Sequence, residues 1–411
     1  MIIQFKRFWN SLSPDLRWIL LAIFLSGIAE GLTANFHTLY LQYLKAKPQE
    51  IGATLGIAGV ATIFVYIPIG MLADRGRRKL IILVAWVSTV VTFTWLALAP
   101  DWRWAIPGFM LYTFSSFARP AFSAQIATSD RGGNLNRTFS LTLTSFSLGS
   151  LLAPALGGWI GEHFGLRIVF ASTGLVYLCS TLALLPISSQ AASTVRPSVV
   201  RLGRILTDRP FLWLIVVLML NVFAINLGIL LAPNYMQDVK GLNLPQIGTL
   251  GTFAALGGIV VTLSLGRIRA ERRTPLLAVQ LAGLLALVFL LASPVARGGA
   301  LPLLAVLAYF FRGGTDAIWL VMSGRLGQRL SPEILSMGFA FRDTAVRLAL
   351  TFAPLAAGQL YGVNPELPLY VSLALTGATM LLTLTLPNHR PVLNADSPQV
   401  ETPQAESVTR P

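Results

Sequence analysis

Long apolar stretches separated by short polar segments run through most of the 411-residue chain. Each stretch is about 20 residues long, the length that an α-helix needs to cross the hydrocarbon core of a bilayer. The predicted spans are 17–41, 50–72, 79–99, 104–127, 138–160 and 166–186, followed by 211–236, 246–266, 275–293, 300–323, 335–361 and 367–387. The pattern predicts an all-α membrane protein with 12 transmembrane helices.

Two polar segments divide the chain into predicted domains. Residues 187–210 separate the two sets of spans and are predicted to form a cytoplasmic linker, and residues 388–411 are predicted to be a disordered cytoplasmic tail. The domains are then an N-terminal six-helix bundle over 1–186 and a C-terminal six-helix bundle over 211–387. The first apolar run continues to about Leu41 without a small-residue cleavage site, so it is interpreted as a span and not as a signal peptide.

Lys and Arg are distributed unevenly between the two sides of the predicted membrane. If the N-terminus is cytoplasmic, 21 of the 31 basic residues fall in inside segments, 6 in outside segments and 4 within spans. Cytoplasmic loops are enriched in these residues. We therefore expect both termini in the cytoplasm of a plasma or inner membrane protein. Membrane topology also accounts for the net charge of +14, so no nucleic acid partner is expected.

The composition excludes an ordinary soluble enzyme. Only 12% of the residues are charged and the mean hydropathy is +0.68, whereas a soluble domain carries about 25% charged residues. Cys179 is the only cysteine, no Cys/His cluster suggests a metal site, and no phosphate-binding GxxxxGK[ST] loop occurs. We expect no enzymatic activity, no metal and no cofactor.

The two halves of the sequence repeat each other. Residues 51–52 match 247–248 as Ile-Gly at an offset of 196, and "APALGG" at 153–158 matches "APLAAG" at 353–358 at an offset of 200. Parallel repeats of this kind build secondary transporters that bind their substrate between the halves.

The segment 70–79, "GMLADRGRRK", resembles the signature that the major facilitator superfamily carries between its second and third spans. The matching residues are Gly70, Asp74, Arg75, Gly76, Arg77 and Arg78, with one spacer residue missing before Gly76. Asp74 is placed to meet the positive end of a helix dipole. The resemblance implies that this loop gates the transporter against the start of the eleventh span; the alternative is that the arginines only set topology.

A second segment, "GSLLAPALGG" at 149–158, resembles a motif in the fifth span of drug/proton antiporters. Gly149, Ala153 and Gly157 recur every four residues and so permit close helix packing. Pro154 removes a helix hydrogen bond and favours a bend, and Gly158 completes the motif. The resemblance implies export over import, with a generic packing seam as the alternative.

Polar and ionisable residues within the spans are candidates for function, because each ionised group costs at least about 2.5 kcal/mol in lipid. The candidates for proton coupling and for the substrate cavity are Glu30, His37, Arg119, Asn226, Arg312 and Asp316. Their spans are those that line the central cavity in the family resembled.

Charge pairing suggests roles for these candidates. Glu30 and Arg119 lie at depths that allow a pair, with Glu30 as the proton-binding carboxylate, although a fixed structural ion pair is an alternative. Arg312 and Asp316 are four residues apart and can pair. His37 either titrates near neutral pH or only lines the wetted cavity.

A further charged group begins the eleventh span. Arg342, Asp343 and Arg347 are interpreted as an inner-gate cluster in which Asp343 and Arg347, four apart, can pair. The alternative is an interfacial cluster whose side chains reach water.

These observations predict a monomeric transporter that moves a small-molecule substrate by alternating access in the lipid bilayer. The favoured function is proton-coupled export of amphipathic or drug-like compounds. One alternative is an uptake symporter for a sugar, organic anion or other nutrient, in which Arg119 and Arg312 would bind an anionic group. A second alternative is a non-transporting polytopic receptor.

Overall fold

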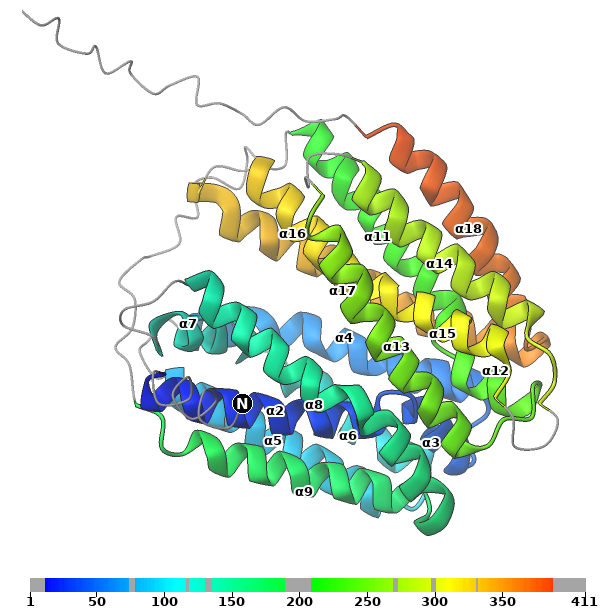
Figure 1. Ribbon diagram of the computed structural model, residues 1–411, viewed down its shortest axis with the longest axis horizontal. Helices are drawn as coiled ribbons and strands as arrows, with labels where there is room; N and C mark the ends of the chain where they lie inside the picture. Colours follow the sequence, from blue (N-terminus) through cyan, green and yellow to red (C-terminus); the bar gives the residue numbers. More distant parts are fainter. Residues whose placement is uncertain are drawn as a thin grey trace, which may run out of the picture.

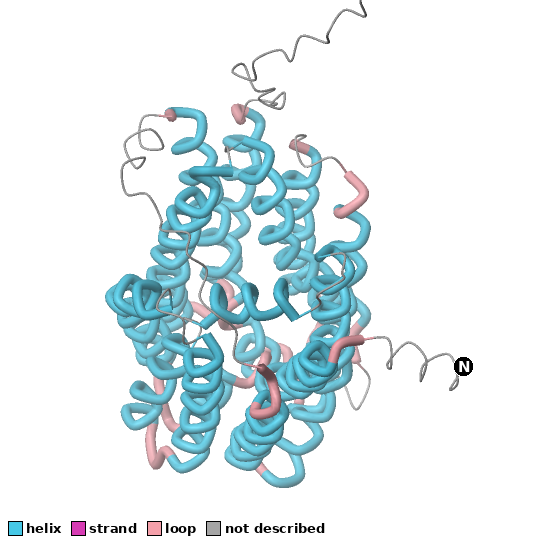
Figure 2. Tube along the Cα trace, turned by 90° about the vertical axis from the view of Figure 1, so that its left-hand side faces the viewer, coloured by secondary structure: helices cyan, strands magenta, loops and turns pink. Residues whose placement is uncertain are grey.

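The computed structural model describes residues 12–73, 78–115, 118–129, 135–188, 208–268, 273–296, 301–329 and 332–386. All regular structure in these residues is helical, and they contain no β-strand (Figures 1 and 2). The predicted all-α class is confirmed.

The first half of the chain forms eight of these helices. They are α2 (Pro14–Thr33), α3 (His37–Tyr43), α4 (Pro48–Ala73), α5 (Arg78–Leu98), α6 (Trp102–Ser115), α7 (Arg119–Ser129), α8 (Leu135–Phe164) and α9 (Leu166–Leu184). The second half forms α11 (Arg209–Ile229), α12 (Ala232–Asp238), α13 (Leu244–Leu265), α14 (Thr274–Ala292), α15 (Leu303–Gly314), the 3₁₀ turn η3 (Thr315–Ala317), α16 (Ile318–Arg329), α17 (Pro332–Val363) and α18 (Leu367–Leu384).

Many of these helices are suited to a bilayer. Within the described residues, nine helical segments are long and apolar enough to cross a membrane. Large apolar side chains face outwards, among them Leu98 (75% exposed), Leu175 (62%) and Leu381 (67%), which lipid would cover. The count of 12 spans stays a prediction.

The helices form two groups that meet at one end. In Figure 1, α2–α9 lie below and α11–α18 above, and the groups converge at the end that holds α3 and α12 and diverge toward α7 and α16. We call the converging end the closed end. Contacts between the groups are made mainly by α8 with α13 and by α4 with α17. The boundaries of the predicted domains stay a prediction.

Two glycine crossings bring these helix pairs together. A Cβ on Gly158 of α8 would lie 3.1 Å from the Cα of Gly248 in α13, and a Cβ on Gly358 of α17 would lie 3.0 Å from the Cα of Gly52 in α4. Gly52 and Gly248 are 196 residues apart and Gly158 and Gly358 are 200 apart, so the internal repeat relates the two crossings. The absence of a side chain permits this close backbone approach.

The remaining residues of the 149–158 motif have different neighbours. Gly149 lies against the backbone of Phe24 and Gly157 against that of Leu32, both in α2 of the same half. Pro154 lies inside α8, and its carbonyl group faces Gly248. The motif therefore packs α8 on its own half with one face and on the other half with another.

Four of the predicted spans consist of more than one helix, and in the fourth the residues between α6 and α7, 116–117, lie outside the described residues. The first consists of α2 and α3 with a turn at 34–36, and the seventh consists of α11 and α12 with a turn at 230–231. The tenth consists of α15 and α16 joined through η3. The first two turns correspond at the offset of 196, so the repeat extends to the places where helices break.

Candidate functional site: a cavity between the two helix groups

A cavity of about 1030 Å³ lies between the two helix groups. Both halves line it, and its polar lining includes Glu30, Asn35, His37, Tyr112, Asn226, Arg312 and Asp316. Five of the six predicted cavity residues are therefore brought together. The sixth is Arg119, whose backbone belongs to α7 but whose side chain lies outside the described residues.

Glu30 is held by two phenols from other helices. The hydroxyl of Tyr112 in α6 donates to Oε2 at 2.7 Å, and that of Tyr177 in α9 donates to Oε1 at 2.5 Å. Hydrogen bonds to an ionised carboxylate are stronger than those between neutral groups. The predicted pairing of Glu30 with Arg119 stays a prediction, because the side chain of Arg119 lies outside the described residues.

His37 sits among aromatic rings. Its ring centroid lies 5.7 Å from Phe109, 5.6 Å from Tyr112 and 5.8 Å from Phe170. The Nε2 atom is buried and has no hydrogen-bond partner in the described part of the chain. Tyr112 thus contacts His37 with its ring and Glu30 with its hydroxyl, and it joins the two predicted residues into one cluster.

Arg312 crosses from one half to the other. Its Nη1 donates to Oδ1 of Asn35 at 2.7 Å, and its guanidinium carbon lies 5.0 Å from the ring centroid of Tyr309. The described side chains of Arg312 and Asp316 form no ion pair, so the predicted pairing is wrong for this state. Residue 316 lies in the 3₁₀ turn η3, which takes it out of the i,i+4 relation of a continuous α-helix.

Two further polar residues complete the lining. Asp316 is exposed toward the cavity. Asn226 donates from Nδ2 to the carbonyl oxygen of Val222, one turn back in α11, at 2.8 Å. It therefore presents its amide oxygen as the free acceptor for a ligand in the cavity.

Hydrogen bonds close the cavity at one end. Gln42 of the first half donates from Nε2 to Oδ1 of Asp238 at 2.8 Å, and it accepts a hydrogen bond from Asn234. Tyr361 donates to the other oxygen of Asp238 at 3.0 Å. Asp238, Asn234 and Tyr361 all belong to the second half, so this network joins the halves beside the glycine crossings.

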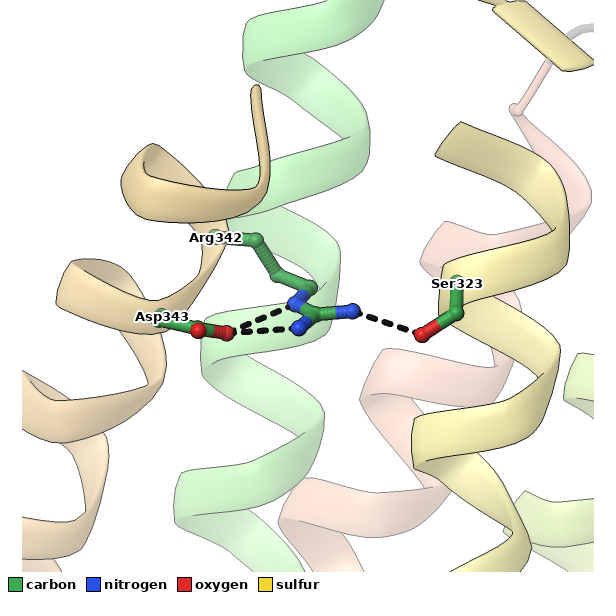
Figure 3. A network of polar contacts seen from close by, with 3 residues as sticks. All are labelled: Ser323, Arg342 and Asp343. Carbon is green, nitrogen blue, oxygen red and sulfur yellow. Dashed lines mark hydrogen bonds and ion pairs between the residues drawn. The ribbon is translucent and has the colours of Figure 1, made fainter. Parts of the chain in front are cut away.

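The predicted inner-gate cluster lies in α17, and Figure 3 shows Arg342 and Asp343 of this cluster beside Ser323 of α16. Arg342 forms an ion pair with Oδ1 of Asp343 at 2.7 Å and donates to Oγ of Ser323 at 2.8 Å. Its guanidinium carbon lies 4.8 Å from the ring centroid of Phe339. Asp343 is therefore bonded to its neighbour in sequence, whereas the sequence suggested Arg347, which lies one turn on and is half-buried.

Other predicted gating residues are only partly covered. Gly70 and Arg78 lie in α4 and α5, but the side chain of Arg78 and all of residues 74–77 lie outside the described residues. The proposed contact between this loop and α17 stays a prediction. No group of three or more His, Cys, Asp or Glu residues that could hold a metal occurs in the described part.

Two groups of lipid-suited helices that meet at one end and enclose a polar cavity define a polytopic membrane transporter. The chain belongs to the Major Facilitator Superfamily, whose family profile matches residues 19–323. It is a multi-pass membrane protein of a transporter family and not an enzyme.

Curated relatives at low identity include a multi-drug resistance efflux pump and a multidrug resistance protein. The multi-drug resistance efflux pump PmrA of Streptococcus pneumoniae is 25% identical over 248 residues, which cover 58% of this chain and 60% of PmrA. The multidrug resistance protein MdtG of Enterobacter lignolyticus is 26% identical over 263 residues, which cover 61% of this chain and 62% of MdtG. The chain thus spans about three fifths of the length of the curated relatives that it matches.

Solved transporter structures share the fold over almost the whole chain. The nucleoside transporter NupG superposes with a TM-score of 0.73 at 14% identity and covers 91% of this chain and 98% of NupG. The peptide transporter POT in complex with sulfate gives a TM-score of 0.69 at 15% identity and covers 91% of this chain and 94% of POT. At these identities the likeness concerns the fold alone.

Proposed function

We propose that the protein is a proton-coupled exporter of amphipathic small molecules that works by alternating access. The observation that carries the proposal is a shared cavity into which both halves project ionisable side chains, Glu30 and His37 from one and Arg312 and Asp316 from the other. Ionisable groups at membrane depth that face a shared cavity mark a path for ions or substrates. The likeness to PmrA, a multi-drug resistance efflux pump, supports the direction of transport.

The walls of the cavity mix polar and apolar side chains, which suits an amphipathic ligand. The α8 wall presents Ser140 and Thr144 beside Leu143. The α13 wall presents Thr262 beside Ile259. Pockets of this kind hold ligands by apolar contact and orient them with a few polar groups. An amphipathic compound matches both walls.

Alternating access would follow from motion of the halves about this cavity. If both termini are cytoplasmic, as the distribution of Lys and Arg favours, the closed end with α3 and α12 faces outwards. The state described here would then be inward-facing, and its outer end would open when the glycine crossings and the Asp238 network separate.

Glu30 is the proposed site of proton binding. Its carboxylate faces the cavity, and the two phenols fix its orientation without neutralising its charge. A proton and a polar ligand group can therefore compete for the same oxygens, which is the requirement for exchange of one against the other.

Flux in proteoliposomes tests this function. Purified protein is reconstituted with a fluorescent amphipathic dye, and a pH gradient is imposed in each direction. We expect dye to move in the direction opposite to proton flow. This movement should stop when an ionophore removes the pH gradient. Movement of dye together with protons would instead support the uptake symporter, and flux that ignores the gradient would refute proton coupling.

A further inference from the structure

Asn35 belongs to the first half, but its side chain extends into the second half. It lies in the turn between α2 and α3 and is only 4% exposed. Its amide nitrogen occupies the place that a Cβ on Gly251 of α13 would take, and such a Cβ would also lie 2.7 Å from the Cβ of Pro154. A methyl group at Gly251 would thus expel Asn35. Because Gly251 has no side chain, the second half has room for the amide group of Asn35 from the first half.

The amide oxygen of Asn35 accepts a hydrogen bond from a charged group of the second half. Arg312 donates to it from Nη1 at 2.7 Å, so Asn35 contacts both α13 and α15. Arg312 precedes Asp316 by four residues, yet its guanidinium reaches across to the first half. A flexible cation that lies between a neutral acceptor and a nearby carboxyl group has two possible partners.

Asp316 has few other charged groups to interact with. The helices packed against η3 are α13, α14, α15 and α16; α13 and α14 contain no ionisable residue. In α15 the ionisable residues are Tyr309 and Arg312, and in α16 they are Arg325 and Arg329, nine residues or more beyond Asp316. Across the cavity, Glu30 and His37 face it from the first half. Arg312 is therefore the cation within reach of Asp316 on these helices.

We propose that Asn35 is the residue that couples the ionisation of Asp316 to closure of the end formed by α3 and α12. When Asp316 is protonated, Arg312 remains on Asn35 and the halves stay joined. When Asp316 is ionised, it attracts Arg312, Asn35 loses its partner, and the closed end is free to separate. This inference rests on the proposed function and adds Asp316 to Glu30 as a second carboxyl group whose protonation changes the closed end.

The sign of the pH effect follows from this exchange. Low pH neutralises Asp316 and favours the Asn35–Arg312 contact, so closure is favoured at low pH and opening at high pH. With the predicted orientation, a proton taken up from outside would close the outer end, and its loss to the cytoplasm would allow that end to reopen. This order suits exchange of a proton for an exported ligand.

Spin-label distances across the closed end test the coupling. Lys47 and Val363 are exposed, lie at the closed end and belong to different halves; both are replaced by labelled cysteines in a Cys179→Ser background. We expect the distance distribution of the parent to shift from short to long as the pH rises. Asp316→Asn is expected to keep the short distance at every pH.

Variants of Asn35 give opposite expected results, which separates coupling from damage to the fold. Asn35→Ala removes the acceptor and is expected to favour the long distance and abolish the pH response. Asn35→Asp supplies a charged partner for Arg312 and is expected to favour the short distance. Gln359→Ala deletes an exposed amide elsewhere on α17 and is expected to respond like the parent.

Two results would overturn the inference. One is a parental pH response in Asn35→Ala, and the other is a shift of Asn35→Ala and Asn35→Asp in the same direction. Failure of the proposed function is seen separately, as absence of proton-driven dye flux in the parent protein. The parent protein can transport dye and respond to pH while the Asn35 variants respond to pH as the parent does. That result would refute only the role of Asn35 in coupling.

Discussion

The carboxylate of Glu30 receives a phenol hydroxyl on each of its oxygens, and those phenols come from residues 82 and 147 positions away in sequence. The arrangement draws α2, α6 and α9 together around one charge. A charged group fixed in this way is presented to the cavity in a defined orientation, which a general proton acceptor needs.

Replacement of Glu30 by glutamine tests its role in proton coupling. Glu30→Gln preserves the shape and an acceptor oxygen but cannot take up a proton. We expect proton-driven dye flux to be lost while exchange of labelled for unlabelled dye at equal pH continues. The measurement is flux in proteoliposomes with and without a pH gradient, and retention of full gradient-driven flux would remove Glu30 from the mechanism.

The phenol contacts are tested by a double-mutant cycle between Glu30→Gln and Tyr177→Phe. A hydrogen bond to a charged group contributes about 1.5–3 kcal/mol, so Tyr177→Phe is expected to cost about that much stability alone and markedly less when Glu30 is already glutamine. Denaturant unfolding of the purified protein in detergent provides the free energies. Strictly additive effects would mean that the two side chains do not interact.

The cost of ions in lipid explains how far the site could be predicted from sequence. Glu30, Arg312 and Asp316 could be placed in a cavity because such groups are expensive in hydrocarbon. Their partners could not, since Asn35 and Tyr177 are neutral residues whose role depends on which helices pack together. The expected ion pair of Arg312 failed for the same reason, because tertiary contact overrode local spacing.

Helices α8 and α13 cross at Gly158 and Gly248, and α4 and α17 cross at Gly52 and Gly358. At this scale the sequence repeat had direct predictive value: the segments that matched at offsets of 196 and 200 are the ones that form the crossings. The partners within each crossing were not evident, because each half contributes to both.

Enlarging one crossing is expected to open the closed end. Gly158→Ala places a methyl group against the backbone of α13, and overpacking of this kind costs typically about 1–3 kcal/mol. The ratio of the separated to the joined state of the crossing should rise by about fivefold to 150-fold. Spin-label distances between Lys47→Cys and Val363→Cys provide the measurement.

The matched control is Gly377→Ala in α18, where a Cβ would meet nothing within 4 Å. It introduces the same methyl group at a position without a close neighbour, so its distances should equal those of the parent. Equal distances in Gly158→Ala would show that the crossing does not limit opening.

The spans themselves were predictable from hydropathy, and each predicted span corresponds to one helix or to consecutive helices. The interruption within the first span was not predictable. Neither glycine nor proline marks the turn at 34–36, so packing against neighbouring helices determines where it breaks.

Two helix groups around a shared cavity have opposite ends, and their placement in the membrane is set by charge. The excess of Lys and Arg in one set of loops predicts that Ser188, at the end described after α9, is cytoplasmic and that Asn364, between α17 and α18, is external.

Thiol labelling of intact cells checks this orientation. In a Cys179→Ser background, a membrane-impermeant reagent is expected to label Asn364→Cys in intact cells but to label Ser188→Cys only after the cells are opened. The reversed labelling pattern would mean that the molecule has the opposite orientation in the membrane. The state described here would then be outward-facing.

The turns that interrupt α2–α3 and α11–α12 have a consequence for chemical selectivity. Terminal carbonyl groups of a helix lack their usual donors, and Ala34 and Leu230, at these two turns, line the cavity. Main-chain oxygens at such points can accept a hydrogen bond from any compound that carries an N–H or O–H group. Recognition through main-chain atoms persists when side chains are substituted. Substitutions along the cavity wall should therefore leave the range of accepted compounds largely unchanged.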